Sequence, residues 1–148
     1  MIGSSSAASA NVRVVVGTWN ELKVDAARIR RVVFVEEQRV SATAESDPND
    51  AHYLHALGFV DDRPVATGRL LPNGTIGRMA VLKEHRGKGL GAAVLAALCE
   101  AAKKRGDKRV ELHAQTRARD FYEKCGFVAF GELFMEQNIE HVMMERML

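Results

Sequence analysis

Short runs of apolar and β-branched residues, separated by turn residues, recur along the chain and predict strands. The clearest run, Arg109–Gln115, alternates strictly, which is typical of a strand with one buried face. Further strands are predicted at 11–17, 52–60, 64–71, 75–81, 127–134 and 141–147. Turn residues separate three successive pairs of these strands, at 61–63, 72–74 and 136–138.

Helical periodicity predicts three helices. In the strongest signal, apolar side chains recur at three- and four-residue steps, and basic residues fill the last turn before Gly106. Another helix has Thr18 or Asn20 as its candidate cap. The helices are predicted at 21–35, 91–104 and 118–124, with a loop at 41–50. This alternation of strands and helices describes one α/β domain.

Length and composition exclude several classes of protein. A length of 148 residues, 47% of them hydrophobic, fits one domain with a core of its own. No run approaches the roughly 18 apolar residues of a membrane span. The balance of 21 Lys and Arg against 19 Asp and Glu argues against a dedicated nucleic-acid binder. Cys99 and Cys125 are too few for a disulfide framework, and the five histidines lack metal-ligand spacing. We therefore expect no membrane, nucleic-acid or metal partner.

The first ten residues are small and polar, with four serines. They lack the basic region and the apolar stretch of a signal peptide. Segment 1–10 is therefore interpreted as a disordered start or a cloning remnant, and the protein is expected to be cytoplasmic.

A glycine-rich loop lies between a predicted strand and the strongest helix, at Arg86, Gly87, Lys88, Gly89, Leu90 and Gly91. Free N–H groups at a helix start bind anions, and glycines let the backbone approach a phosphate closely. Arg86 and Lys88 add positive charge. The loop predicts a pyrophosphate site. The alternative is a glycine-rich connection with surface charges.

Three known phosphate loops can be compared with this one. A Walker A loop needs Ser or Thr after its lysine, whereas Gly89 follows Lys88. A dinucleotide fingerprint matches Gly87, Gly89 and Ala92, but polar residues 83–86 separate it from its strand. The third pattern, Arg or Gln followed by x-x-G-x-G or x-x-G-x-A, matches Arg86, Gly89 and Gly91 in full.

With this third pattern the chain resembles the GNAT N-acetyltransferases. The stretch Arg78–Val81 before the loop and the stretch Phe121–Phe127 after it match the family's signatures. Within the family the chain resembles the small bacterial ElaA-like group. The shared features are Phe34–Gln38, Asp47, Asp50, His55 and Ile139–His141. The resemblance implies one α+β-type GNAT domain over 11–148. It also implies a mixed, mostly antiparallel sheet flanked by helices and splayed between strands 75–81 and 109–115.

The family resemblance also implies an activity, the transfer of an acetyl group from acetyl-CoA to an amine by direct attack. We expect a small-molecule amine rather than a protein lysine, and a homodimer stays open. The residues implied to bind the cofactor are Met79, Ala80 and Val81, through their backbone, and loop residues Arg86, Gly87, Lys88, Gly89, Leu90 and Gly91. Tyr122 occupies the family's general-acid position, and packing against the core is its alternative role.

The general base is less defined. An alkylammonium is mostly protonated at neutral pH, so a base is expected. Glu37 and His113 are the candidates, with Asp50 and His55 behind them, and each also suits a purely structural role. Separate candidates, Arg69 and Arg78, suit binding of an anionic acceptor, because a guanidinium pairs with carboxylate or phosphate. Exposed charges at strand ends are the alternative for both.

Three other functions remain open. A CoA-binding regulatory domain without turnover is disfavoured by Tyr122. A synthase of the acyl-homoserine-lactone type should be longer than 148 residues. A dinucleotide-binding module is disfavoured by the polar residues before Gly87.

Overall fold

The computed structural model describes residues 11–148, so the predicted disordered start or remnant at 1–10 lies outside the described residues. Seven strands form one sheet in the order β1-β2-β3-β4-β5-β7-β6. Every neighbouring pair is antiparallel except β4 and β5, which are parallel. The strands are β1 (Val12–Thr18), β2 (Leu54–Val60), β3 (Arg63–Leu70), β4 (Thr75–Val81), β5 (Arg109–Gln115), β6 (Val128–Glu136) and β7 (Ile139–Met147). The predicted mixed, mostly antiparallel sheet is confirmed.

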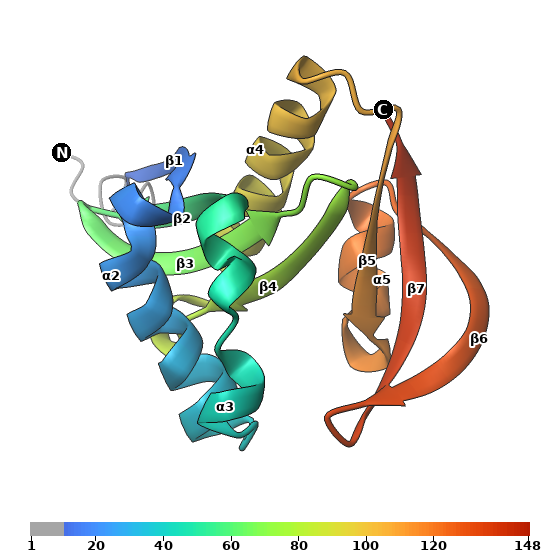
Figure 1. Ribbon diagram of the computed structural model, residues 1–148, viewed down its shortest axis with the longest axis horizontal. Coiled ribbons are helices and arrows are strands. Elements are labelled where there is room, and N and C mark those ends of the chain that lie inside the picture. Colours follow the sequence, from blue (N-terminus) through green and yellow to red (C-terminus); the bar gives the residue numbers. More distant parts are fainter. Residues whose placement is uncertain (1–10) are drawn as a thin grey trace, which may run out of the picture.

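The sheet splits between β4 and β5. These strands pair only through Thr75 with Glu111 and Ile76 with Leu112, and beyond that point they diverge (Figure 1). A bulge lies next in β4, where the register with β3 shifts and Arg78 has φ +50°. Bulges bend a strand locally, which explains why β4 turns away here. The predicted splay of the sheet is therefore confirmed.

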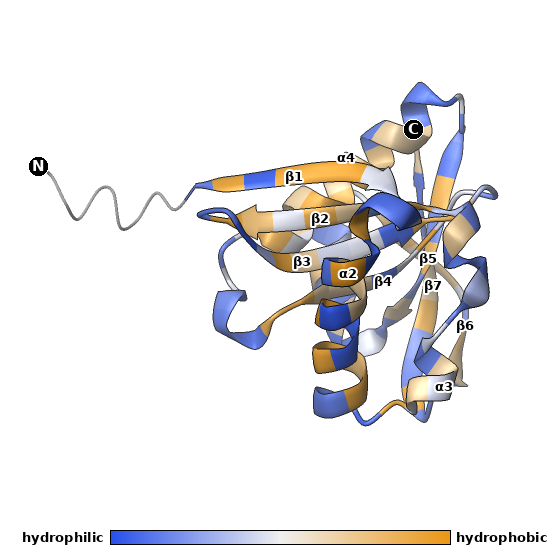
Figure 2. Ribbon diagram, turned by 60° about the vertical axis from the view of Figure 1, so that its left-hand side comes forward, coloured by the Kyte–Doolittle hydropathy of each residue, from blue (hydrophilic) through white to orange (hydrophobic). Residues whose placement is uncertain are grey.

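Helices cover both faces of the first half of the sheet (Figure 1). On one face lies α2 (Trp19–Arg30), which carries hydrophilic and hydrophobic patches in Figure 2, as expected of a helix with one side on a sheet. On the other face α4 (Leu90–Lys104) packs against β1 to β4. Two shorter helices, α3 (Ala42–Glu45) and α5 (Arg119–Lys124), flank the split in the sheet.

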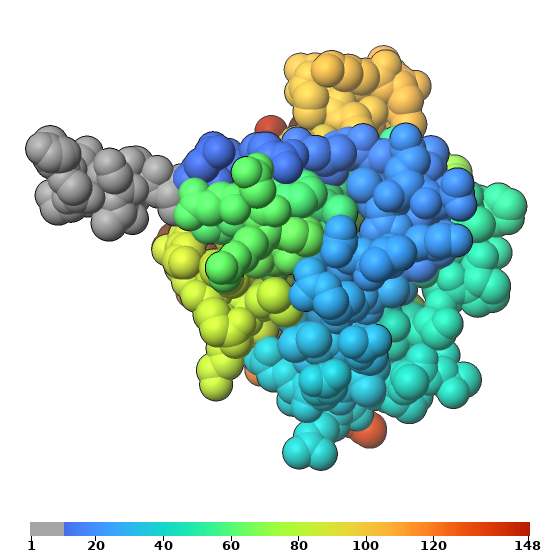
Figure 3. All heavy atoms as spheres, turned by 90° about the vertical axis from the view of Figure 1, so that its left-hand side faces the viewer, coloured from blue at the N-terminus to red at the C-terminus, as the bar shows by residue number. Residues whose placement is uncertain are grey.

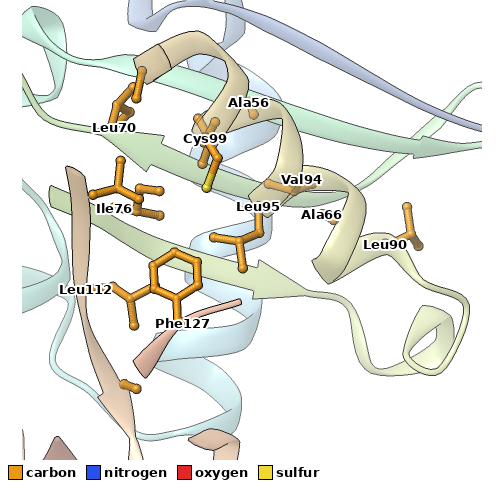
Figure 4. Close-up of a cluster of buried hydrophobic side chains, with 14 of the residues drawn as sticks. Ala56, Ala66, Leu70, Ile76, Leu90, Val94, Leu95, Cys99, Leu112 and Phe127 are labelled. Atoms are coloured by element: carbon orange, nitrogen blue, oxygen red, sulfur yellow. The ribbon is translucent and has the colours of Figure 1, made fainter. Parts of the chain in front are cut away.

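The core reflects this two-sided arrangement. On β2, Leu57 faces α2, whereas Ala56 belongs to the larger cluster on the α4 side (Figure 4). Contact between β3, α4 and β4 is very close. A Cβ on Gly68 would lie 2.5 Å from Met79 Sδ and 2.9 Å from Leu98 Cδ1. Glycine at 68 therefore lets α4 and the β4 bulge approach β3.

Local capping explains where the first helices differ from prediction. Helix α2 begins at Trp19, because Thr18 and Glu21 form a capping box across its first turn. After Arg30 it continues as a π-helical segment, η1 (Arg31–Glu37), rather than as α-helix to 35. The predicted loop 41–50 instead holds α3, capped by Ser41, and a 3₁₀ turn, η2 (Pro48–His52). Segments 19–37 and 38–52 lie side by side at the surface (Figure 3).

The hairpin turns are tighter than predicted. Asp61 and Asp62 both have positive φ, and so do Gln137 and Asn138, which is typical of two-residue hairpin loops. Because the second turn needs only two residues, β6 extends to Glu136 and β7 begins at Ile139, earlier than the predicted start at 141.

Candidate active site

A cavity of about 450 Å³ lies where β4 and β5 separate. Side chains from both halves of the sheet and from the segments over the split line it. They come from η1 and the residues after it (Phe34, Gln38), α3 (Glu45), β3 and β4 (Arg69, Arg78, Met79), β5 (His113, Gln115), α5 (Tyr122) and the β6–β7 hairpin (Glu136, His141). Of the sequence-predicted site residues, the split thus gathers Tyr122, His113, Arg69, Arg78 and Met79.

The glycine-rich loop joins β4 to α4. Gly87 and Gly89 have φ +82° and +81°, a conformation that favours glycine, and Gly89 is the N-cap of α4. Among residues 11–148 no side chain caps this helix, so its first N–H groups have no side-chain partner there. A Cβ added at either glycine would meet no atom within 4 Å and would point into open space. The loop therefore offers an uncovered, backbone-lined cradle that suits a pyrophosphate.

Arg86 and Glu37 are brought together across the start of this loop. Arg86 Nη1 and Nη2 each donate to a Glu37 carboxylate oxygen at 2.7 Å, and Nε donates to the Val81 carbonyl at 2.9 Å. Hydrogen bonding from Arg86 lowers the pKa of Glu37 and raises the pKa of Arg86. The pair ties the loop to the end of η1. It also makes Glu37 a weaker base than an unpaired carboxylate.

Tyr122 lies on α5 and lines the cavity. Its ring packs edge-to-face on Phe121 and Phe127, with centroids 5.0 and 6.1 Å away. Burial raises the pKa of Tyr122 to about 12. The hydroxyl therefore keeps its proton at neutral pH, as a proton donor must.

His113 and Glu136 face each other across β5 and the β6–β7 hairpin. His113 Nδ1 lies 2.8 Å from Glu136 Oε1, and both side chains remain more than 40% exposed. A second histidine, His141, has Nδ1 2.6 Å from the Ile139 carbonyl and Nε2 3.8 Å from Glu136 Oε2. Sequence reasoning did not single out Glu136. The register that pairs β5 with β7 and β7 with β6 places it there.

Arg69 also lines the cavity, but buried carboxylates hold its guanidinium. Its Nη1 donates to Asp47 at 3.0 Å and to Asp50 at 2.8 Å. Asp50 also accepts from Arg30 Nη2 at 3.0 Å and is 1% exposed. No local pattern indicated that Arg30, near the end of α2, would be buried.

His55 lies behind this network rather than in the cavity. Its Nε2 lies 2.9 Å from the Asp50 carbonyl oxygen, and its ring lies 4.7 Å from Trp19. Burial lowers the pKa of His55. Asp50 and His55 therefore have internal partners, and neither lines the cavity.

Arg78 stands apart from these ion pairs. It lies at the β4 bulge, and its Nη2 donates to the carbonyl oxygens of Glu45 at 3.2 Å and Ala44 at 3.5 Å. Its Nε is buried without a hydrogen-bond partner among the described residues. Burial lowers the pKa of Arg78.

The two cysteines are free thiols. Burial raises the pKa of both Cys99 and Cys125, so neither carries the lowered pKa of an activated nucleophile. Within residues 11–148, no group of three or more His, Cys, Asp or Glu side chains is placed to hold a metal ion. None of the helices in the described part of the chain is long and apolar enough to cross a membrane.

Comparison with known proteins agrees with the fold. The family model for the acetyltransferase (GNAT) domain matches residues 23–148. The Bacillus subtilis protein YyaT is 38% identical over 82% of this chain and 86% of its own. The uncharacterized N-acetyltransferase YjcF of the same organism is 34% identical over 90% of this chain and 98% of its own. Escherichia coli ElaA is 31% identical over 80% of this chain and 83% of its own.

A solved structure of one of these relatives has the same fold. The crystal structure of Escherichia coli ElaA superposes with a TM-score of 0.81 at 28% identity, covering 92% of this chain and 99% of ElaA. These matches and the split α/β sheet place the chain in the acyltransferase class. The chain belongs to the GNAT acetyltransferase family, within its ElaA-like group, and it is an acyltransferase enzyme.

Proposed function

We propose that this protein transfers an acetyl group from acetyl-CoA to a primary amine of a small molecule. The observation that carries the proposal is the glycine cradle at the start of α4, which opens beside the split between β4 and β5. Gly87 to Gly91 would bind the pyrophosphate through backbone N–H groups, with Lys88 adding charge. Strand residues Met79 to Val81 would hold the pantetheine arm through their backbone.

The reaction requires three groups from the protein: a hydrogen-bond donor for the carbonyl oxygen, an acid for the departing thiolate and a base for the amine. When bound, acetyl-CoA supplies a thioester carbon, and the amine nitrogen bonds to it as the carbon–sulfur bond breaks. A backbone N–H near Val81 would stabilise the charge on the carbonyl oxygen. Tyr122, which is protonated at neutral pH, would donate its proton to the departing thiolate.

His113 is favoured over Glu37 as the proton acceptor for the amine. Glu37 is held by two hydrogen bonds from Arg86. His113 lines the cavity, and its Nδ1 contacts the Glu136 carboxylate. A carboxylate on Nδ1 favours the tautomer with its proton there, which leaves the Nε2 lone pair free to accept a proton. Glu136 would thus be a positioning residue for His113.

The size of the cavity supports a small acceptor. A volume of about 450 Å³ falls within the usual range for small-molecule sites, roughly 300–1,000 Å³.

A homodimer is supported by exposed apolar residues on the edge strand β6, namely Val128, Leu133 and Met135. Sedimentation would check it. A cytoplasmic location remains a prediction.

Thermal unfolding with acetyl-CoA, CoA, NAD and ATP tests the proposed cofactor. A ligand at 100 times its dissociation constant adds about 2.7 kcal/mol of stability, which is about 5–11 °C for a domain of this size. We expect a shift with acetyl-CoA and CoA only. Lys88→Glu should reduce it by placing a negative charge at the cradle, whereas Lys23→Glu, the same change on α2, should not. No shift with acetyl-CoA, or an equal one with NAD, would refute the proposal.

Thiol release from acetyl-CoA in the presence of amines then separates an enzyme from a binding domain. His113→Gln should lower kcat by about 10²–10⁴-fold, the usual contribution of a positioned base. Glu37→Gln is the matched comparison and should cost much less. If Glu37→Gln is the more damaging change, the assignment of the base is wrong.

A further inference from the structure

Within residues 11–148, one cation in the cavity wall, Arg78, lacks a carboxylate partner. Among the described residues, Arg30 and Arg69 share three buried or partly buried carboxylates, those of Glu45, Asp47 and Asp50. Arg78 lies beside them but is held only by backbone carbonyl oxygens. A partly buried guanidinium without a counter-ion destabilises the folded protein, and binding of an anion would offset that cost.

The backbone aims this side chain at the split in the sheet. Arg78 adopts φ +50°, which is uncommon for a residue with a Cβ, at the bulge that bends β4 away from β5. Bulges beside active sites commonly redirect a side chain. Strain of this kind persists where the surrounding structure enforces it. Here it places Arg78 in the wall of the cavity that also holds Tyr122.

The opposite wall has the complementary charge. Glu136, on the β6–β7 hairpin, lines the same cavity with about 44% of its side chain exposed, and its neighbour is His113. A carboxylate beside a proton-accepting imidazole attracts an ammonium group. Glu45 also lines the cavity, but its carboxylate is paired with Arg30. The cavity therefore has a cationic wall at Arg78 and an acidic wall at Glu136.

We propose that the acceptor carries an oxyanion, a carboxylate or a phosphate, besides its amine, and that Arg78 binds this oxyanion while the amine lies toward Glu136 and His113. This inference rests on the proposed acetyl transfer. Arg69 keeps its internal ion pairs and contributes to the site by holding Asp47 and Asp50 in place.

The test compares acceptors that differ only in the anion. The probes are β-alanine and phenylalanine for a carboxylate, O-phosphoethanolamine for a phosphate, and β-alaninamide and phenylalaninamide as neutral counterparts. Thiol release gives kcat and KM for each. We expect a preference of about 10- to 100-fold in kcat/KM for an anionic probe over its neutral counterpart, the range for a hydrogen bond to a charged group. A preference for the carboxylates or for the phosphate identifies the source of the oxyanion.

Two variants keep the test decisive. Arg78→Asn removes the charge and retains a residue that tolerates positive φ, and Arg78→Lys retains the charge without the planar fork. Arg78→Asn should abolish the preference through KM, Arg78→Lys should restore part of it, and Arg63→Asn, at the exposed start of β3, should leave it unchanged. Thermal unfolding checks that each variant folds.

The outcomes distinguish failure of the anionic acceptor class from failure of the proposed acetyl transfer. Equal rates for anionic and neutral probes, or a preference that survives in Arg78→Asn, overturns the acceptor class. If acetyl-CoA stabilises the protein but no anionic probe is acetylated, the acceptor class is again overturned while the proposed cofactor stands. If acetyl-CoA does not bind, the proposed function itself fails.

Discussion

Replacing Asp50 by asparagine tests whether the buried ion pairs hold the wall of the cavity together. Asp50 is 1% exposed and accepts hydrogen bonds from Arg30 at 3.0 Å and from Arg69 at 2.8 Å. Asparagine keeps the shape but removes the charge. Each arginine then retains one carboxylate, from Glu45 or Asp47. Because two guanidinium groups each lose a charged, buried hydrogen-bond partner, we expect a cost of about 3–5 kcal/mol, as when one partner of a buried pair is removed.

For a domain of this size, that loss corresponds to a fall of about 6–20 °C in melting temperature. Urea unfolding followed by circular dichroism would give the free energy directly. The matched control is Asp62→Asn, because Asp62 is 82% exposed and its pair with Arg13 spans 3.4 Å. Such a surface pair contributes less than about 1 kcal/mol. A loss below about 1 kcal/mol in Asp50→Asn would refute the view that these ion pairs stabilise the wall.

Three further predictions follow from packing and titration. Gly68→Ala should cost about 1–3 kcal/mol, because the new Cβ would lie 2.5 Å from Met79 Sδ. Gly77→Ala, with open space around its Cβ, is the control, and equal unfolding free energies would contradict the close packing. Burial lowers the pKa of His55, so the unfolded chain gains a proton near pH 6.5 that the folded one resists. Stability should therefore fall as the pH drops below about 6.5, and an unchanged slope in His55→Gln would disprove this cause. Tyr122→Phe should lower kcat by about 10²–10⁴-fold without a loss of fold, and an unchanged kcat would remove its role as acid. Because the pKa of Tyr122 is raised to about 12, the wild-type hydroxyl should stay protonated at any lower pH. A fall in rate at a pH well below about 12 must then come from another group.

Local patterns were enough to predict the elements and the loop. The alternation in Arg109–Gln115 is confirmed, with Val110, Leu112 and Ala114 buried. The apolar stripe of α4 is confirmed in the same way. These signals work because side-chain direction repeats every two residues in a strand and every 3.6 in a helix. The glycine motif was also predictable, because a left-handed backbone beside a helix start favours glycine at 87 and 89.

Capping and tight turns were predictable only in part. Thr18 was one of two candidate caps, and its reciprocal hydrogen bonds with Glu21 decide between them. The π-helical turns of η1 and the short helix α3 were missed, since neither has a strong periodic signal of its own. Packing against the sheet and hydrogen bonds to Ser41 determine these segments instead.

The sequence by itself determined the family, the fold class and the glycine-rich loop, because each depends on residues close together in the chain. Tertiary structure alone decided which distant side chains meet, in the cavity and beside the glycine-rich loop. Arg86 lies 49 residues from Glu37, and Glu136 lies 23 residues from His113. Strand register and the β4 bulge bring such groups together, and no local pattern encodes them. The same packing gave carboxylates to Arg30 and Arg69, whereas Arg78 has only backbone oxygens as partners in the described part of the chain.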